Sequence, residues 1–94
     1  MKIQLTKTFI DRLNKLVDFI AEDKPTTARK FKVDILNRIN KLNKMYYRNR
    51  KSIHFNDDNI RELIFKGFKI IYKVYLKEKK IVIFAILKYE ENVS

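Results

Sequence analysis

IRELIFKGFKIIYKVYLKEKKIVIFAIL, the stretch from Ile60 to Leu87, carries the strongest structural signal in the chain. It contains three runs rich in β-branched and aromatic residues, separated by Lys66-Gly67 and by the charged segment Lys77 to Lys80. Such runs between short polar turns are typical of β-strands, so the stretch predicts a three-stranded antiparallel meander. Gly67 is the single glycine of the chain, and its place between two runs favours a turn that needs a positive φ.

Alternation along the middle run predicts which side of the sheet is buried. One side is apolar or aromatic throughout, with Phe68, Ile70, Tyr72, Val74 and Leu76. The other side is mixed, with Lys69, Ile71, Lys73 and Tyr75. Because side chains alternate between the faces of a strand, we expect the first side to meet the rest of the core and the second to be partly wet. The third run is apolar on both faces, as expected of a central strand.

The residues before the meander predict one short strand and two helices. Lys2 to Leu5 alternate polar and apolar residues as a strand does. Thr8 is expected to cap a helix that runs to about Glu22, whose apolar residues recur at helical spacing as Phe9, Leu13, Leu16, Val17 and Ile20. Pro25 suits the first turn of a second helix, whose apolar stripe is Ala28, Phe31, Ile35, Ile39, Leu42 and Tyr46.

The connection between these helices, Asp23-Lys24, is short enough to require an antiparallel hairpin. From Tyr47 to Asn59 the periodicity fails, and the polar segment YRNRKSIHFNDDN predicts a solvated loop of about a dozen residues. A loop of that length in a compact domain points to function. The expected fold is α+β in the order β-α-α-β-β-β, with a helical hairpin packed on a small, mainly antiparallel sheet, in one domain from 1 to 94.

Composition restricts the partners and the chemistry. There are 22 Lys and Arg against 11 Asp and Glu, a net charge of +11, so we expect a polyanionic partner: nucleic acid, an acidic protein segment or anionic lipid. The absence of cysteine excludes disulfides and thiolate chemistry, and it favours a cytoplasmic location. The longest apolar run is too short to span a bilayer, and no set of residues has metal-ligand spacing, so neither a membrane, a metal nor a cofactor is expected.

Two short motifs in this element order point to a family. Arg61-Glu62-Leu63 is followed by Phe68-Lys69-Ile70-Ile71-Tyr72 and then by an apolar run. This pattern resembles the RelE/ParE superfamily of toxins from type II toxin-antitoxin systems, whose members place an "REL" strand before a "YR-x-x-Y" strand. The resemblance implies a cognate acidic antitoxin as partner. It also implies one of two targets: mRNA on the ribosome for the ribonucleases, or DNA gyrase for ParE-like members.

Three residues are candidates for catalysis if the chain is a ribonuclease: Lys69, Lys88 and Tyr89. Attack by a 2′-hydroxyl needs a base, an acid and cations that hold the phosphorane charge. Lys69 stands where the superfamily's ribonucleases have an arginine, and a lysine lacks the bidentate fork that grips phosphate. No His or Arg adjoins Tyr89 in sequence, and Glu90-Glu91 would repel phosphate. These departures favour a ParE-like toxin that binds its target without cleaving RNA.

Five residues are candidates for binding the target or nucleic acid: Arg48, Arg50, Lys51, His54 and Arg61. The first three combine cations for phosphate with flanking aromatic rings on which bases can stack. A solvated loop anchored by Tyr46 and Phe55 explains the same pattern, and a surface ion pair with Glu62 explains Arg61. We expect reversal of the loop charges to leave the fold intact. A non-toxic basic nucleic-acid-binding module is the third hypothesis.

Overall fold

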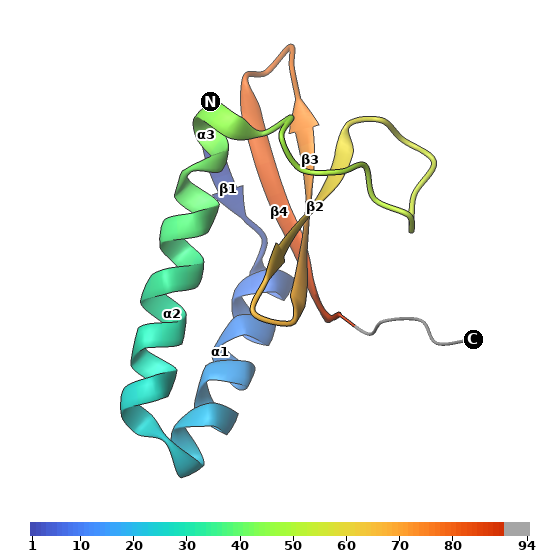
Figure 1. The fold of residues 1–94 in the computed structure, drawn as a ribbon. Coiled ribbons are helices and arrows are strands. Elements are labelled where there is room, and N and C mark those ends of the chain that lie inside the picture. The colour runs from blue at the N-terminus through green and yellow to red at the C-terminus, as the bar shows by residue number, and fades with distance from the viewer. Residues whose placement is uncertain (90–94) are drawn as a thin grey trace, which may run out of the picture.

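The computed structural model describes residues 1–89 and packs a helical hairpin against a four-stranded sheet (Figure 1). The chain contributes its elements in the order β1 (Lys2–Leu5), α1 (Lys7–Asp23), α2 (Pro25–Asn40), α3 (Leu42–Met45), β2 (Ile60–Phe65), β3 (Phe68–Tyr75) and β4 (Lys80–Lys88). This order confirms the α+β prediction, with α3 as one extra short helical turn.

The strands lie in the order β1-β4-β3-β2. The meander β2-β3-β4 is antiparallel, and β1 pairs in parallel with β4, where Ile3 lies opposite Ile81. The sheet is therefore mixed but mainly antiparallel, and β4 is a central strand as its two apolar faces predicted. The turn between β2 and β3 has a positive φ at Lys66 (45°) and at Gly67 (84°), the conformation of a two-residue hairpin turn that Gly67 predicted.

The first helix begins earlier than the sequence suggested. Thr6, not Thr8, is the N-cap, because its side-chain oxygen accepts a hydrogen bond from the backbone N–H of Phe9 at 3.1 Å. Both threonines suit a cap, and β1 decides between them: it ends at Leu5, and the N–H of Thr6 still bonds to Ile83. Pro25 opens α2 as predicted, directly after the Lys24 connection.

The core lies between the helices and one face of the sheet. It contains Phe9 and Leu13 of α1, four residues of α2 and α3, and the inward residues of the strands: Phe31, Ile35, Ile39, Leu42, Leu63, Phe65, Ile70, Tyr72, Val74, Ile81, Ile83 and Ile86. Leu76, which was expected on the buried face, is 49% exposed. It lies beyond the end of β3, where its carbonyl accepts a turn hydrogen bond from Lys79.

A β-bulge changes the orientation of β4 half-way along its length. Ile71 pairs with Ala85 and Tyr72 with Ile83, so Phe84 has no partner on β3. Before the bulge Ile81 and Ile83 face the helices, and after it Ile86 does. A bulge re-aims every side chain that follows it, so the end of β4 presents its residues to the opposite faces from those that strict alternation predicts. Within residues 1–89, no helix is long and apolar enough to cross a membrane.

Candidate functional site

The segment from Tyr46 to Asn59 wraps around the β2 edge of the sheet (Figure 1). The N–H of Glu62 donates to the Arg50 carbonyl at 3.0 Å, and the N–H of Ser52 donates to the Ile60 carbonyl at 2.8 Å. Lys51 forms an isolated bridge with Arg61. The expectation of a freely solvated loop is therefore wrong for its centre, because the outer edge of β2 offers backbone partners that Arg50 to Ser52 take up.

Before it crosses the edge, this loop is held to the helix side of the sheet. The hydroxyl of Tyr72, a core residue, donates to the Tyr46 carbonyl at 2.6 Å and accepts from the Asn49 amide at 3.1 Å. Burial raises the pKa of Tyr72, because the charged phenolate would lose its hydration there. The polar end of a buried aromatic residue thus fixes where the loop starts.

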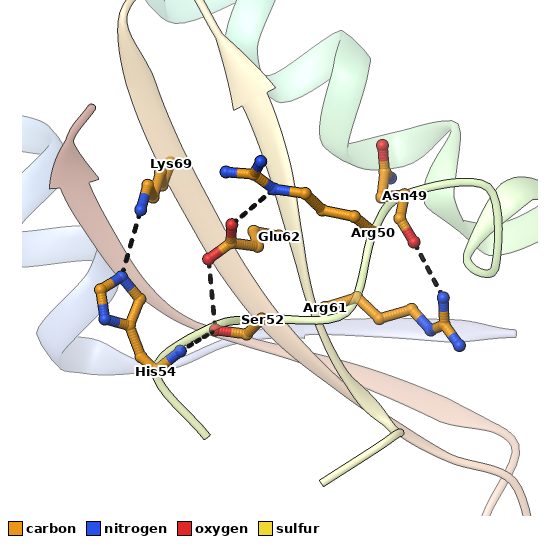
Figure 2. Close-up of polar contacts among 7 residues, drawn as sticks. All are labelled: Asn49, Arg50, Ser52, His54, Arg61, Glu62 and Lys69. Carbon is orange, nitrogen blue, oxygen red and sulfur yellow. Dashed lines mark hydrogen bonds and ion pairs between the residues drawn. The ribbon is translucent and has the colours of Figure 1, made fainter. Parts of the chain in front are cut away.

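Glu62 is a buried carboxylate that organises the loop on the opposite face. Its side chain is 0% exposed, and it accepts hydrogen bonds from Arg50 Nε at 2.8 Å and from Ser52 Oγ at 3.2 Å (Figure 2). The bond to Glu62 is the main cause that raises the pKa of Arg50, and Tyr89 adds to it. The half-exposed guanidinium bonds to Glu62 through Nε alone, so its two terminal nitrogens take no part in this pair.

Arg61 and Glu62 do not pair with one another. As neighbours on a strand they point to opposite faces, and Figure 2 shows the Arg61 side chain directed away from Glu62 toward Asn49. Arg61 donates to the Asn49 carbonyl at 2.9 Å and stacks 4.6 Å from the centroid of the Tyr47 ring. The surface ion pair suggested for Arg61 is thus replaced by two separate roles, and Arg61 supports the loop from the helix side.

After the edge, the loop covers part of the sheet face away from the helices. The backbone N–H of His54 donates to Ser52 Oγ at 3.2 Å, and His54 Nε2 lies 3.3 Å from Lys69 Nζ (Figure 2). Phe55 meets Phe84 of β4 edge-on, with ring centroids 5.7 Å apart. The sequence placed His54 in a loop, but its contact with Lys69 arises only because the loop folds back over β3.

Tyr89 joins this cluster because of the bulge in β4. Its N–H donates to the Gly67 carbonyl at 2.7 Å, and its ring lies on the same face as Lys69. Lys69 Nζ lies 5.2 Å from the ring centroid and the Arg50 guanidinium carbon 5.7 Å from it. The statement that no His or Arg stands beside Tyr89 holds for the sequence alone. In the fold, Arg50 contacts the ring of Tyr89. His54 does not contact that ring, but it contacts Lys69, which does.

Other predicted site residues lie elsewhere. Lys88 lines a groove on the helix side. Arg48 lines a hollow with Arg38 and Lys41. Lys51 forms an ion pair with Asp58 at 2.7 Å. The loop cations Arg48, Arg50 and Lys51 therefore have three different sets of neighbours. Glu90 and Glu91, which were expected to repel phosphate, lie outside the described residues.

Comparison with known families identifies the chain. The model of the family "ParE toxin of type II toxin-antitoxin system, parDE" matches residues 3–93. The chain belongs to the ParE toxin family.

Two solved structures resemble this ParE toxin. The chromosomal ParDE toxin-antitoxin system from P. aeruginosa is 20% identical, with a TM-score of 0.78, and the match covers 96% of this chain and 97% of that one. The isolated E. coli RelE toxin is 12% identical, with a TM-score of 0.61, and the match covers 98% of this chain and 87% of that one. At these identities the likeness concerns the fold. No curated protein sequence matches the chain.

The cluster around Tyr89 gives this ParE toxin a place that suits an anion. Arg50 and Lys69 lie over one aromatic ring, with His54 beside Lys69, and cations fixed beside a ring can hold a phosphate or carboxylate in defined geometry. Residues 1–89 hold no group of three acidic or histidine side chains suited to a metal ion.

Sequence reasoning missed Ser52 and Glu62, which orient Arg50 and the loop around it. The available signal was Glu62 itself, an acidic residue within the strand sequence IRELIF from Ile60 to Phe65, whose other residues apart from Arg61 are apolar.

Proposed function

We propose that this ParE toxin arrests growth by binding an essential target through the sheet face that carries Arg50, Lys69 and Tyr89. DNA gyrase is the target that the ParE class suggests. A cognate acidic antitoxin of the ParD type neutralises the toxin, in keeping with the P. aeruginosa ParDE system whose structure is similar. Binding of that antitoxin should raise the toxin's melting temperature by mass action, which thermal melts with and without the antitoxin test.

The observation that carries this proposal is the state of Lys69. The residue is only 8% exposed, yet within residues 1–89 it has no carboxylate at ion-pair distance. Its contacts are the His54 ring nitrogen and the face of Tyr89. A largely buried lysine that has no carboxylate partner within residues 1–89 can form an ion pair with an anion that a partner supplies, and this supports the face around Lys69 as the binding surface.

The experiment compares two lysines on the same face of β3. Lys73 forms an ion pair with Asp57 at 3.2 Å, whereas Lys69 has none within residues 1–89. We expect Lys69→Met to abolish growth arrest after induction, and Lys73→Met to retain it. With purified proteins, inhibition of gyrase supercoiling should follow the same order. Growth arrest by Lys69→Met at wild-type strength, with circular dichroism showing both variants folded, would place the target surface elsewhere.

A ribonuclease is the second candidate, and one observation favours it. The fold brings Arg50 and Lys69 to the ring of Tyr89 and His54 to Lys69, and these are residue types that acid-base cleavage of RNA can use. The lysine at position 69 argues against it, because a single ammonium replaces a bidentate guanidinium. Primer extension on transcripts after induction separates the two functions. Discrete cleavages that disappear in Tyr89→Phe would establish the ribonuclease.

A further inference from the structure

A groove with cationic walls runs between α2 and the edge strand β2. Two hollows of about 300 Å³ and about 200 Å³ form it, and they adjoin because Arg38 and Lys41 line both. The larger hollow reaches Phe65 at the end of β2, and the smaller one reaches Leu63 and continues to Arg48 in the loop after α3. The groove therefore follows β2 from its end toward the start of the loop.

Three cations in this groove have no carboxylate partner. Arg38, Lys41 and Arg48 are exposed, and none of them takes part in an ion pair within residues 1–89. The amide of Asn37 lines the larger hollow beside them. Several separate cations along one groove suit a ligand that carries several separate negative charges.

The one carboxylate in the described lining does not cancel this charge. Asp34 is paired with Lys66 of the β2–β3 turn at 3.1 Å and with Lys30 at 3.2 Å. Both partners lower the pKa of Asp34, and the hydrogen bond from Lys66 contributes most. Two ammonium groups thus surround a single carboxylate, so this end of the groove also has a net positive charge.

The apolar residues beneath the cations are closed to a ligand. Leu42, Leu63 and Phe65 are only 2%, 3% and 6% exposed, and the Arg38 guanidinium carbon lies 5.7 Å from the centroid of the Phe65 ring. Met45 is the one apolar residue of the described lining that is exposed. A protein segment that must bury apolar side chains gains little here, whereas a phosphate backbone needs only the cations.

The aromatic residues beside the groove favour a duplex over a single strand. Single-stranded nucleic acids bind where their bases can stack on free aromatic rings next to cations. Tyr47 is the exposed ring next to Arg48 in sequence, but it already contacts the Arg61 guanidinium at 4.6 Å and the tilted ring of Tyr46 at 4.6 Å. A duplex keeps its bases stacked on one another and presents its phosphates to the protein, so it needs no such ring.

We propose that the groove between α2 and β2 binds the phosphate backbone of duplex DNA through Arg38, Lys41 and Arg48. The choice of DNA over duplex RNA rests on the proposed function, because a toxin held by DNA gyrase would lie next to the DNA of that enzyme. In this arrangement the face around Lys69 contacts the protein target, and the groove contacts the nucleic acid.

The test measures the affinity of the purified full-length toxin, without antitoxin, for a fluorescent DNA duplex by anisotropy over a series of salt concentrations. The groove variant is Arg38→Gln with Lys41→Gln. The control, Arg29→Gln with Lys44→Gln, removes the same charge at exposed positions that line none of the described hollows and have no ion pair within residues 1–89. Circular dichroism checks the fold of each variant.

We expect the groove variant to bind DNA at least about tenfold more weakly, and the slope of log affinity against log salt to decrease by about two, one for each lost phosphate contact. The control should stay within about threefold of wild type with an unchanged slope. Lys41→Gln alone leaves the contact of Arg38 with Phe65 in place and should lower the slope by about one. Equal weakening by groove variant and control would reduce the effect to net charge and overturn the site, as would unchanged affinity in the groove variant.

Duplex RNA and poly-glutamate are the alternative probes. If either one binds the wild-type toxin as tightly as DNA does and loses affinity in the groove variant but not in the control, the groove belongs to that class of polyanion and the DNA assignment is refuted. We expect both to bind more weakly than DNA.

Lys69→Met separates this inference from the proposed function. We expect this variant to bind the DNA duplex with wild-type affinity although growth arrest is lost. Weakened DNA binding in Lys69→Met, as strong as in the groove variant, would place the DNA on the Tyr89 face and refute the groove. Growth arrest that persists in Lys69→Met, with DNA binding still dependent on Arg38 and Lys41, would refute the proposed target surface and leave the groove supported.

Discussion

The face of the sheet that meets the helices and the face that meets the loop from Tyr46 to Asn59 belong to the same four-stranded sheet, yet they are held in different ways. The helix side is a continuous apolar core in which Phe9, Ile35, Ile70, Ile81 and Ile83 are 0% exposed. The loop side depends on a few polar contacts centred on Glu62 and Lys69. Stability is therefore concentrated on one face, and binding groups are gathered on the other.

This difference shows why the two faces should respond differently to substitution. Apolar packing is non-directional and shared among many neighbours. A hydrogen bond to a buried carboxylate has one geometry, and its loss leaves a specific group without a partner. Changes on the helix side should lower global stability in proportion to the volume removed. On the loop side, the loss of stability should depend on which partner of a hydrogen-bonded pair is removed.

The largest expected effect is on the helix side. Ile35→Ala removes a fully buried side chain from the middle of α2 and leaves a cavity between the helix and the sheet. We expect the free energy of unfolding to fall by about 3 kcal/mol. The control is Val33→Ala on the same helix, where Val33 is 54% exposed and the change should stay within about 0.5 kcal/mol. Urea unfolding measures both, and similar losses would mean that the core does not dominate stability.

The next effect tests the loop side through an asymmetry. Arg50→Ala leaves the buried Glu62 carboxylate with Ser52 as its remaining side-chain partner, whereas Glu62→Gln leaves Arg50 free to turn to water. We expect Arg50→Ala to destabilise the protein more than Glu62→Gln, and the double variant to regain part of the loss. The expectation that loop charges can be reversed without harm to the fold therefore does not extend to Arg50. A double-mutant cycle by urea unfolding measures the coupling, and equal single losses would refute the asymmetry.

The helix side of the sheet could be predicted from the sequence because it depends on periodicity. The stripe of α2 and the alternation of β3 placed Phe31, Ile35, Ile70 and Tyr72 in the core, where the structure has them. Small errors arose where two residues offer the same chemistry, as at Thr6 and Thr8, or where a strand ends, as at Leu76. Those choices are made by neighbouring elements and not by the local sequence.

The loop side could not be predicted in the same way. The partners Arg50 and Glu62 are separated by a loop without periodicity, and no local pattern gives their distance. The placement of Tyr89 depends on the bulge at Phe84, which exchanges the faces of all later residues of β4. Nothing in the uniformly apolar run IVIFAIL marks that position. The sequence showed which residue types are present, but it did not show which of them contact one another in the fold.

A smaller effect is expected where the two sides are joined. Tyr72→Phe removes the hydroxyl that donates to the Tyr46 carbonyl and accepts from Asn49. We expect the free energy of unfolding to fall by about 1–2 kcal/mol, since both loop groups lose a buried partner.

The pKa of Tyr72 is raised by burial. Above the ordinary value of 10.0 the unfolded chain therefore releases this proton first, and wild-type stability falls as pH rises. Tyr72→Phe should show a smaller alkaline decline in urea unfolding, and an unchanged decline would contradict the assignment.

The smallest effect lies at the outer end of the loop. Asp57 accepts the backbone N–H of Asn59 at 2.9 Å and pairs with Lys73 at 3.2 Å, and these contacts, the first above all, lower its pKa below the ordinary 3.8. A lowered pKa contributes stability that is present above the ordinary value and lost as pH falls through the lowered one. Asp57→Asn keeps an oxygen for the turn but removes the charge, so it should be slightly less stable than wild type near neutral pH.

The two proteins should then converge in acid, because protonation of wild-type Asp57 removes the same charge. Urea midpoints measured from about pH 7 down to about pH 2 test this, with Asp18→Asn as control at an exposed carboxylate that has no ion pair within residues 1–89. Because the side chains of Asp57 and Lys73 are each about one third exposed, solvent screens the pairing and the shift should be the smallest of the four. A difference between wild type and Asp57→Asn that persists unchanged into acid would mean that the turn geometry, and not the charge, carries the contribution.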